Sequence, residues 1–148
     1  MTLARTNIAL LAALLLTGGA QAHSHKLKAL EIVHPWCWET QAATKTVAVY
    51  MTVRNSARRP DRLVRASASI AEKTELRAGR DAAVKSLEAK AGDELILKRD
   101  GPHILLTGVK RRLGAYDAFV MTLVFERAGK VEVEVAVEEG STAEPAKH

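Results

Sequence analysis

The residue types best suited to metal chemistry in this sequence are five histidines and a single cysteine. Two of the histidines, His23 and His25, would stand at the new amino terminus if a leader were cleaved after Ala22. A free amine, two backbone amides and an imidazole at the third position can surround a metal ion with a square of nitrogens, which suits Cu(II) or Ni(II). The alternative is a frayed terminus whose histidines meet only solvent. This pattern makes His23 and His25 candidate metal ligands.

A third candidate ligand, His103, follows the turn sequence Asp100-Gly101-Pro102 and begins a predicted strand. On that strand it shares a face with Leu105, while Ile104 points the other way. A histidine at a strand end beside an apolar face is more often a rim residue with satisfied hydrogen bonds than a ligand. Taken alone, His103 is therefore the weaker candidate.

The single cysteine, Cys37, excludes an intrachain disulfide and a cysteine-rich zinc site. His34 precedes it by three positions, so a Cys–His nucleophile is one interpretation. Pro35 imposes an extended turn between them, and no third residue marks an orienting partner. The plainer interpretation is a small, partly buried side chain between Trp36 and Trp38. Because no other catalytic motif is present, the sequence does not predict an enzyme.

The first residues predict a secretory signal peptide over residues 1–22. Arg5 supplies a positive start, an apolar run covers Ile8 to Leu16, and Ala20-Gln21-Ala22 has the small-x-small form of a cleavage site. A membrane anchor is less favoured, because the run is far shorter than the roughly 20 apolar residues that span a bilayer. No later stretch is longer, so we expect a periplasmic protein without a membrane span after cleavage. Scattered charges of both signs, 22 Lys+Arg and 17 Asp+Glu, do not favour nucleic acid as a partner.

The sequence predicts that β-strands position these residues. Alternation of apolar and polar residues is clearest over residues 45–54, 119–126 and 130–137, the last two forming the firmest predicted hairpin. About eight short strands separated by turn signals predict an all-β sandwich or barrel. We assign residues 23–27 to a flexible N-terminus, residues 28–138 to the domain, and residues 139–148 to a disordered tail. Met51 and Met121 share faces with apolar neighbours and are interpreted as core residues.

Beyond these patterns, the chain resembles a known family in three regions: LEIVHPW at 30–36, VAVYMTVRN with PDRLVRASASIAEKTEL at 47–76, and GPHILLTGVKRRL through MTLVFERAGKVEVEVAV at 101–137. Together they resemble the periplasmic copper chaperones of the PCuAC type, over about residues 28–138. The resemblance implies a cupredoxin-like β-sandwich. It also implies a carrier that holds Cu(I) and assists copper delivery to cytochrome c oxidase.

The family's Cu(I) ligands are two histidines and two methionines, and the resemblance carries only one of them over. Arg77 follows Glu75-Leu76 where the first histidine is expected. Residues 79–90, which correspond to the methionine-bearing hairpin, contain no methionine. His103 keeps its place, but Leu105 stands at the second methionine position.

Two functional hypotheses follow. In the first, the protein is a copper carrier that uses His103, His23 and His25, with Cu(II) favoured at the terminal pair. Its partner would be a cytochrome oxidase copper subunit or another periplasmic copper carrier. In the second, it is a metal-free periplasmic interaction module that has kept the fold and lost the Cu(I) site. Trp36 and Trp38 would then supply the contact surface, because tryptophan is favoured at binding hot spots.

Overall fold

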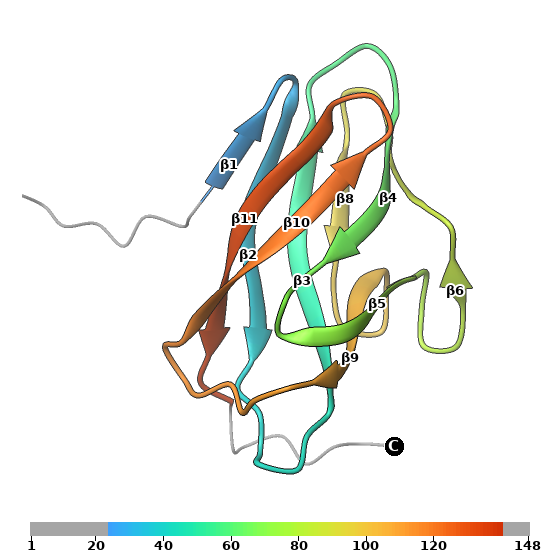
Figure 1. Cartoon of the computed structure of the whole chain (residues 1–148). Coiled ribbons are helices and arrows are strands. Elements are labelled where there is room, and N and C mark those ends of the chain that lie inside the picture. The colour runs from blue at the N-terminus through green and yellow to red at the C-terminus, as the bar shows by residue number, and fades with distance from the viewer. Residues whose placement is uncertain (1–23, 141–148) are drawn as a thin grey trace, which may run out of the picture.

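The structure, a computed structural model, describes residues 24–140, and every regular element in that range is a β-strand (Figure 1). The strands are β1 (Ser24–Leu27), β2 (Leu30–Trp38), β3 (Thr46–Asn55), β4 (Asp61–Ser67), β5 (Ala71–Arg77), β6 (Ala83–Val84), β7 (Leu87–Ala89), β8 (Glu94–Leu97), β9 (His103–Val109), β10 (Ala118–Phe125) and β11 (Gly129–Glu138). A helix of the length and hydrophobicity needed to cross a membrane is not found in this range.

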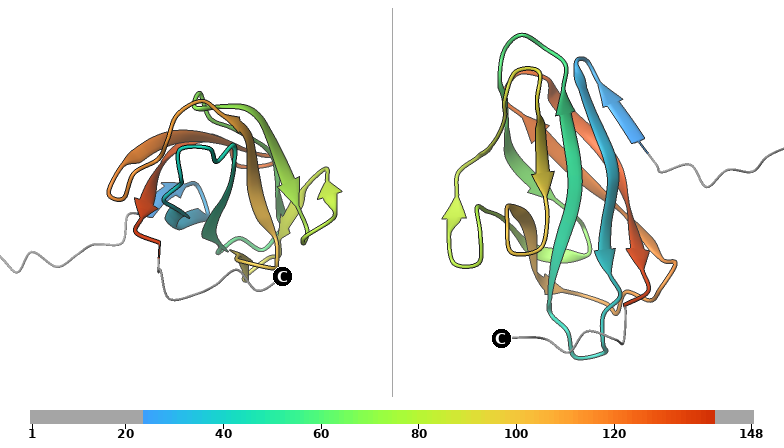
Figure 2. Two further views of the ribbon diagram at one scale, coloured as in Figure 1. Left: turned by 90° about the horizontal axis from the view of Figure 1, so that it is seen from below. Right: turned by 180° about the vertical axis from the view of Figure 1, so that it is seen from behind.

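The strands form one strongly curled sheet in the order β6-β5-β9-β3-β2-β11-β10-β4-β7, with β1 added on β2 and β8 on β3. Neighbouring strands run antiparallel except β11 and β2, which are parallel. The view from below shows the sheet wrapping around its interior (Figure 2). This arrangement confirms the predicted cupredoxin-like β-sandwich or barrel.

The interior is filled by alternate residues of the long strands, as the alternation in the sequence predicts. On β10, Phe119, Met121, Leu123 and Phe125 are all buried. Met51 on β3 is 2% exposed and Met121 is 0% exposed, which confirms both as core residues. Full burial of an apolar side chain of this size contributes about 1.5–3 kcal/mol to stability.

A β-bulge in β2 reverses which side chains face the interior. The register of β2 on β3 shifts between Val33 and Trp36, and His34 takes a positive φ of 47°. Pro35 cannot donate to the ladder, so it is tolerated at this interruption. Beyond the bulge Cys37 faces the core and Trp38 is 40% exposed.

Some short elements differ from the sequence expectation. Residues 24–27 were expected in a flexible N-terminus, but they form β1, which pairs with β2 from Ser24↔Val33 to Leu27↔Leu30. Residues 78–92, for which no strand was predicted, carry the two short strands β6 and β7. The predicted signal peptide, His23 and tail residues 141–148 lie outside the described residues.

Candidate functional site

His103 is held by the tight connection between β8 and β9. The Gly101 N–H donates to the Lys98 carbonyl at 3.1 Å, which closes this turn. His103 Nδ1 lies 2.9 Å from the Gly101 carbonyl oxygen. A carbonyl can only accept, so Nδ1 carries the proton of the neutral ring and Nε2 keeps its lone pair. His103 therefore presents a free acceptor nitrogen, the form in which imidazole binds metals.

Opposite His103 stands Arg77, its register partner on β5. Arg77 Nη2 donates to Glu75 Oε2 at 2.7 Å, and Lys73 Nζ contacts Glu75 Oε1 at 2.7 Å. The hydrogen bonds from Lys73 and then Arg77 hold the pKa of the Glu75 carboxyl below its usual value. The Glu75 carboxylate on this face is thus already neutralised by two cations.

These residues do not assemble a multidentate metal site. Within residues 24–140, no group of three or more His, Cys, Asp or Glu side chains is placed to hold a metal ion. Leu105, the register partner of Glu75, offers no donor atom. The Arg77 guanidinium beside His103 also repels a cation at this position. His103 is one ligand that needs others to complete a site.

The structure does not bring His25 to His103. His25 lies on β1, which pairs with β2, whereas β9 pairs with β3 and β5. Its Nε2 accepts a hydrogen bond from the Glu134 N–H at 3.3 Å. A metal held by His25 would therefore occupy a site separate from one at His103.

Cys37 and His34 do not form a nucleophilic pair. His34 Nε2 bonds to Glu138 Oε1 at 2.7 Å, while Cys37 is 0% exposed on the opposite side of β2. Burial, reinforced by the negative charge of Glu138, raises the pKa of the Cys37 thiol to about 12. The thiolate that nucleophilic attack requires is therefore suppressed.

We expect Cys37 to be alkylated by iodoacetamide at pH 8 about 1000-fold more slowly in the folded protein than in the unfolded one. A pKa of about 12 against an ordinary value of 9.0 leaves that much less thiolate, before burial slows access further. Folding favours the protonated thiol, so this contribution to stability is complete below pH 9 and is lost as the pH rises toward 12. Mass spectrometry of timed samples, with guanidinium-unfolded protein as control, measures the ratio. Similar rates in both states would contradict a buried thiol.

Next to His103 lies a groove that we call the aromatic surface, formed by Trp36, Trp38, Tyr50 and Ile96. The rings of Trp36 and Trp38 meet edge to face at 4.7 Å, and the Trp36 and Tyr50 rings lie 5.1 Å apart. The groove has a volume of about 410 Å³. The Tyr50 ring lies 6.5 Å from that of His103, so one residue that lines the groove neighbours the histidine.

Sequence reasoning identified Trp36 and Trp38 but missed Tyr50 and Ile96. Ile96 is 49% exposed, on the solvent side of β8. Its only signal was an isoleucine at the outward position of the alternating segment ELILK. That outward position cannot be known until the strand has been paired with β3.

Comparisons with known proteins identify a matching family and similar solved structures. The model of the family described as "Putative lipoprotein LpqE-like" matches residues 30–137. A copper-bound PCuAC domain from PmoF2 is 28% identical, with a TM-score of 0.74, and the match covers 80% of this chain and 99% of that one. A Cu(I)-bound solution structure of DR1885 from Deinococcus radiodurans is 26% identical, with a TM-score of 0.62, covering 80% and 83%.

An apo PCuAC domain from PmoF1, 22% identical with a TM-score of 0.75, shares the fold and covers 80% of this chain and 100% of that domain. No curated protein matches the sequence. The resemblance predicted from the residues is confirmed by these matches.

Proposed function

The chain belongs to the LpqE-like family of putative lipoproteins, and from this premise we propose that it is a copper-chaperone-like protein of the periplasm. The observation that carries the proposal is the 28% identity to a copper-bound PCuAC domain across 99% of that domain. His103 supports it, because its Nδ1 is bonded to the Gly101 carbonyl and its Nε2 keeps a lone pair that can bind a metal. The role proposed is that of a carrier.

We propose that His103 supplies one copper ligand and that donors outside the described residues complete the coordination of the ion. A partner protein is one source, and we propose a cytochrome oxidase copper subunit or another copper carrier. The aromatic surface beside His103 is the natural contact for that partner. Cys37 is buried in β2, so in the folded domain its thiol can neither carry an attached lipid nor bind a metal held by a partner.

A second copper site is proposed at the mature amino terminus, where His23 and His25 would hold Cu(II). That square of nitrogens uses the backbone amides of Ser24 and His25. In β1 these two residues pair with Val33 and Ile32 of β2. An amide nitrogen bound to copper has lost its proton and cannot donate to the ladder. Terminal copper binding is therefore coupled to release of the start of β1.

Copper titration of residues 23–148 tests the proposal. Because His103 is a single ligand, we expect the protein alone to bind Cu(I) weakly, as measured against a chromogenic chelator, and His103→Ala to lose that binding. Cu(II), followed by its visible band, should be lost when residues 23–25 are deleted. His34→Ala is the matched control, because that ring is engaged with Glu138.

Each half of this proposal can fail separately. Cu(II) binding that survives the deletion unchanged would show that the terminal site is wrong. Cu(I) binding that is equal in His103→Ala and His34→Ala would remove the domain site. Binding of neither ion would leave no role in copper handling.

The second candidate function is a metal-free interaction module that works through the aromatic surface. It is favoured by the Arg77 guanidinium, which stands opposite His103 where a ligand is expected. Trp38→Ala is expected to weaken partner capture under both hypotheses, so copper binding separates them. Under the carrier hypothesis the variant keeps the copper affinity of the parent protein, whereas under the module hypothesis neither protein binds copper.

A further inference from the structure

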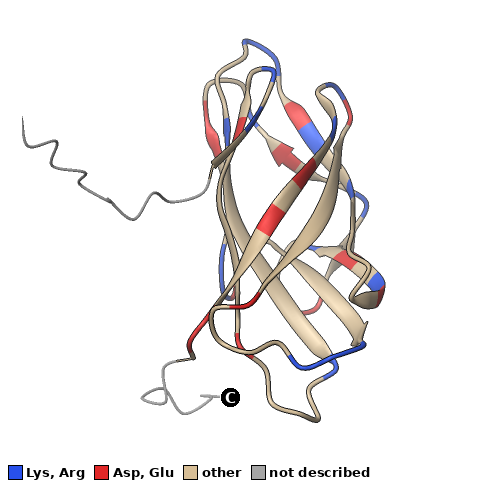
Figure 3. Ribbon diagram, turned by 60° about the vertical axis from the view of Figure 1, so that its left-hand side comes forward, with Lys and Arg blue, Asp and Glu red and all other residues tan. Residues whose placement is uncertain are grey.

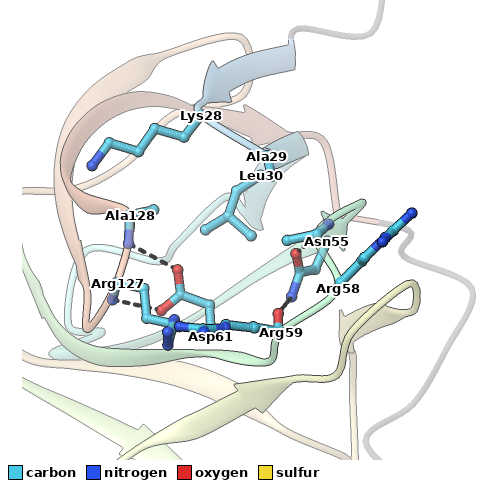
Figure 4. Close-up of a pocket in the computed structure, with 10 residues that line it drawn as sticks. Lys28, Ala29, Leu30, Asn55, Arg58, Arg59, Asp61, Arg127 and Ala128 are labelled. Carbon is cyan, nitrogen blue, oxygen red and sulfur yellow. Dashed lines mark hydrogen bonds between the residues drawn. The ribbon is translucent and has the colours of Figure 1, made fainter.

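A pocket of about 370 Å³ opens at the end of the sheet where β3 finishes, and it is not part of the His103 region (Figure 4). Three connections enclose it: the β1–β2 turn at Lys28 and Ala29, the β3–β4 loop over residues 55–61, and the β10–β11 turn at Arg127 and Ala128. β9, by contrast, pairs with the other half of β3, from Thr46 to Val49. The pocket therefore lies apart from His103, and a function for it does not depend on the copper-carrier hypothesis.

The pocket joins an apolar floor to a cationic rim. The floor includes Leu30, Ala57 and Ala128, of which Leu30 is 2% and Ala128 8% exposed. Four exposed cations line the rim: Lys28, Arg58, Arg59 and Arg127. Figure 3 shows Lys and Arg in the loops at this upper end, and in Figure 4 Lys28 extends across the opening above Leu30 while Arg58 points outward.

These four side chains form no ion pair with any residue in the range 24–140. Some cations elsewhere in the fold do pair with carboxylates, such as Arg62 with Glu126, Arg54 with Glu94 and Arg80 with Asp100. The rim charges are therefore left to solvent or to a ligand. Like charges gathered around an apolar hollow repel one another, and an anion bound among them removes that repulsion.

The walls of the pocket are fixed by two buried polar residues. Asn55 Nδ2 donates to the carbonyl oxygens of Arg59 at 2.9 Å and Ala89 at 3.0 Å, which pins the β3–β4 loop. Asp61, the only acid among the lining residues, accepts from the Arg127 N–H at 2.8 Å and the Ala128 N–H at 2.9 Å. Its oxygens are thus occupied by backbone donors. The pocket is preformed, which lowers the entropy cost of binding.

We propose that this pocket binds a small amphiphilic phosphate, with the phosphate on Arg59, Arg127 and Lys28 and a short apolar group on the Leu30 floor. Guanidinium groups bind phosphate oxygens in pairs, and cations from three separate connections match a group with three oxygens better than a carboxylate with two. The volume lies within the range of small-ligand sites. A phospholipid headgroup and a free organic phosphate share this chemistry.

Titration of the purified protein with hexyl phosphate, followed by amide chemical shifts, tests the proposal. We expect shifts confined to residues 28–30, 55–61 and 127–128. Affinity should exceed that for inorganic phosphate by at least about tenfold, since burial of two methylene groups suffices for that factor. Equal affinity for inorganic phosphate, or shifts spread over all basic loops, would overturn the proposal.

Variants assign the binding to this pocket. Arg59→Gln with Arg127→Gln is expected to weaken hexyl phosphate binding at least about tenfold, because each removes a charge-assisted hydrogen bond. Arg65→Gln with Lys110→Gln removes the same charge from exposed positions outside the pocket and should change nothing. Ala57→Leu fills the floor without altering charge and should weaken hexyl phosphate but not inorganic phosphate. Unfolding midpoints confirm that each variant is folded, and equal weakening in both double variants would contradict the site.

Sedimentation with lipid vesicles distinguishes a phospholipid headgroup from a free organic phosphate. Sedimentation with phosphatidylglycerol vesicles but not with phosphatidylcholine vesicles, abolished by Arg59→Gln with Arg127→Gln, would identify a lipid headgroup. Hexyl phosphate binding without vesicle binding would identify a free organic phosphate. Vesicle binding that both double variants lose equally, without hexyl phosphate binding, would overturn the proposal, because it would show only general attraction of a basic protein to an anionic surface.

Discussion

The double variant Arg77→His with Leu105→Met is expected to bind Cu(I) about 100-fold more tightly than the parent protein, at least tenfold for each added ligand. Arg77 and His103 are register partners on β5 and β9, so their Cβ atoms stand about 4.5–5.5 Å apart and two imidazoles there can share one ion. Residue 105 lies on the same face of β9 as His103. The variant also removes a positive charge from the site, while Lys73 still neutralises Glu75.

Competition with a Cu(I) chelator measures this affinity, and two controls identify its origin. Arg77→Gln removes the charge without supplying a ligand and should give only a small gain. His103→Ala in the double variant should abolish the gain. If the double variant gains nothing, residues 79–90, which lack methionine, limit the site instead.

Asp61→Ala is expected to lower the free energy of unfolding by about 3 kcal/mol, the largest loss we expect from a single polar substitution in this fold. Asp61 is 5% exposed, and its carboxylate accepts the backbone N–H groups of Arg127 and Ala128 in the β10–β11 turn. The substitution leaves these donors without the carboxylate acceptor that joins the start of β4 to the turn. Hydrogen bonds to a charged acceptor are each worth about 1.5–3 kcal/mol.

Urea unfolding followed by tryptophan fluorescence measures the loss. Asp61→Asn keeps one acceptor oxygen and should cost less than the alanine variant. Asp81→Ala, at an exposed position of the β5–β6 connection, is the matched control and should change stability by no more than about 0.5 kcal/mol. A loss below about 1 kcal/mol in Asp61→Ala would show that water replaces the carboxylate in the turn.

The features that could be predicted from the sequence are those carried by long alternating strands. The hairpin of β10 and β11 and the inward positions of Met51 and Met121 follow from a period of two. The same rule placed Leu105 on the half-buried face shared with His103 and Ile104 in the core. The family resemblance matched Arg77 and His103 with the positions of the family's two histidine ligands, and only the structure shows that they are register partners on β5 and β9.

Other features depend on contacts between distant segments and could not be predicted. The strand β1 has only four residues and is ordered by its pairing with β2 rather than by its own pattern. The bulge at His34 moves Cys37 into the core, and no local rule gives its register. The cationic pocket gathers Lys28, Arg59 and Arg127 from connections far apart in the chain. Such a cluster exists only after the sheet has curled.

The parallel pairing of β2 with β11 also determines when the chain is able to fold. It joins the first long strand to the last, and the bond between His34 and Glu138 spans 104 positions. A contact of such sequence separation carries a large loop-closure cost, so folding is slow compared with that of helical domains of this size. A growing polypeptide that lacks β11 has no partner for the edge of β2 after the bulge. The sheet is therefore completed only when the last strand of the chain is available.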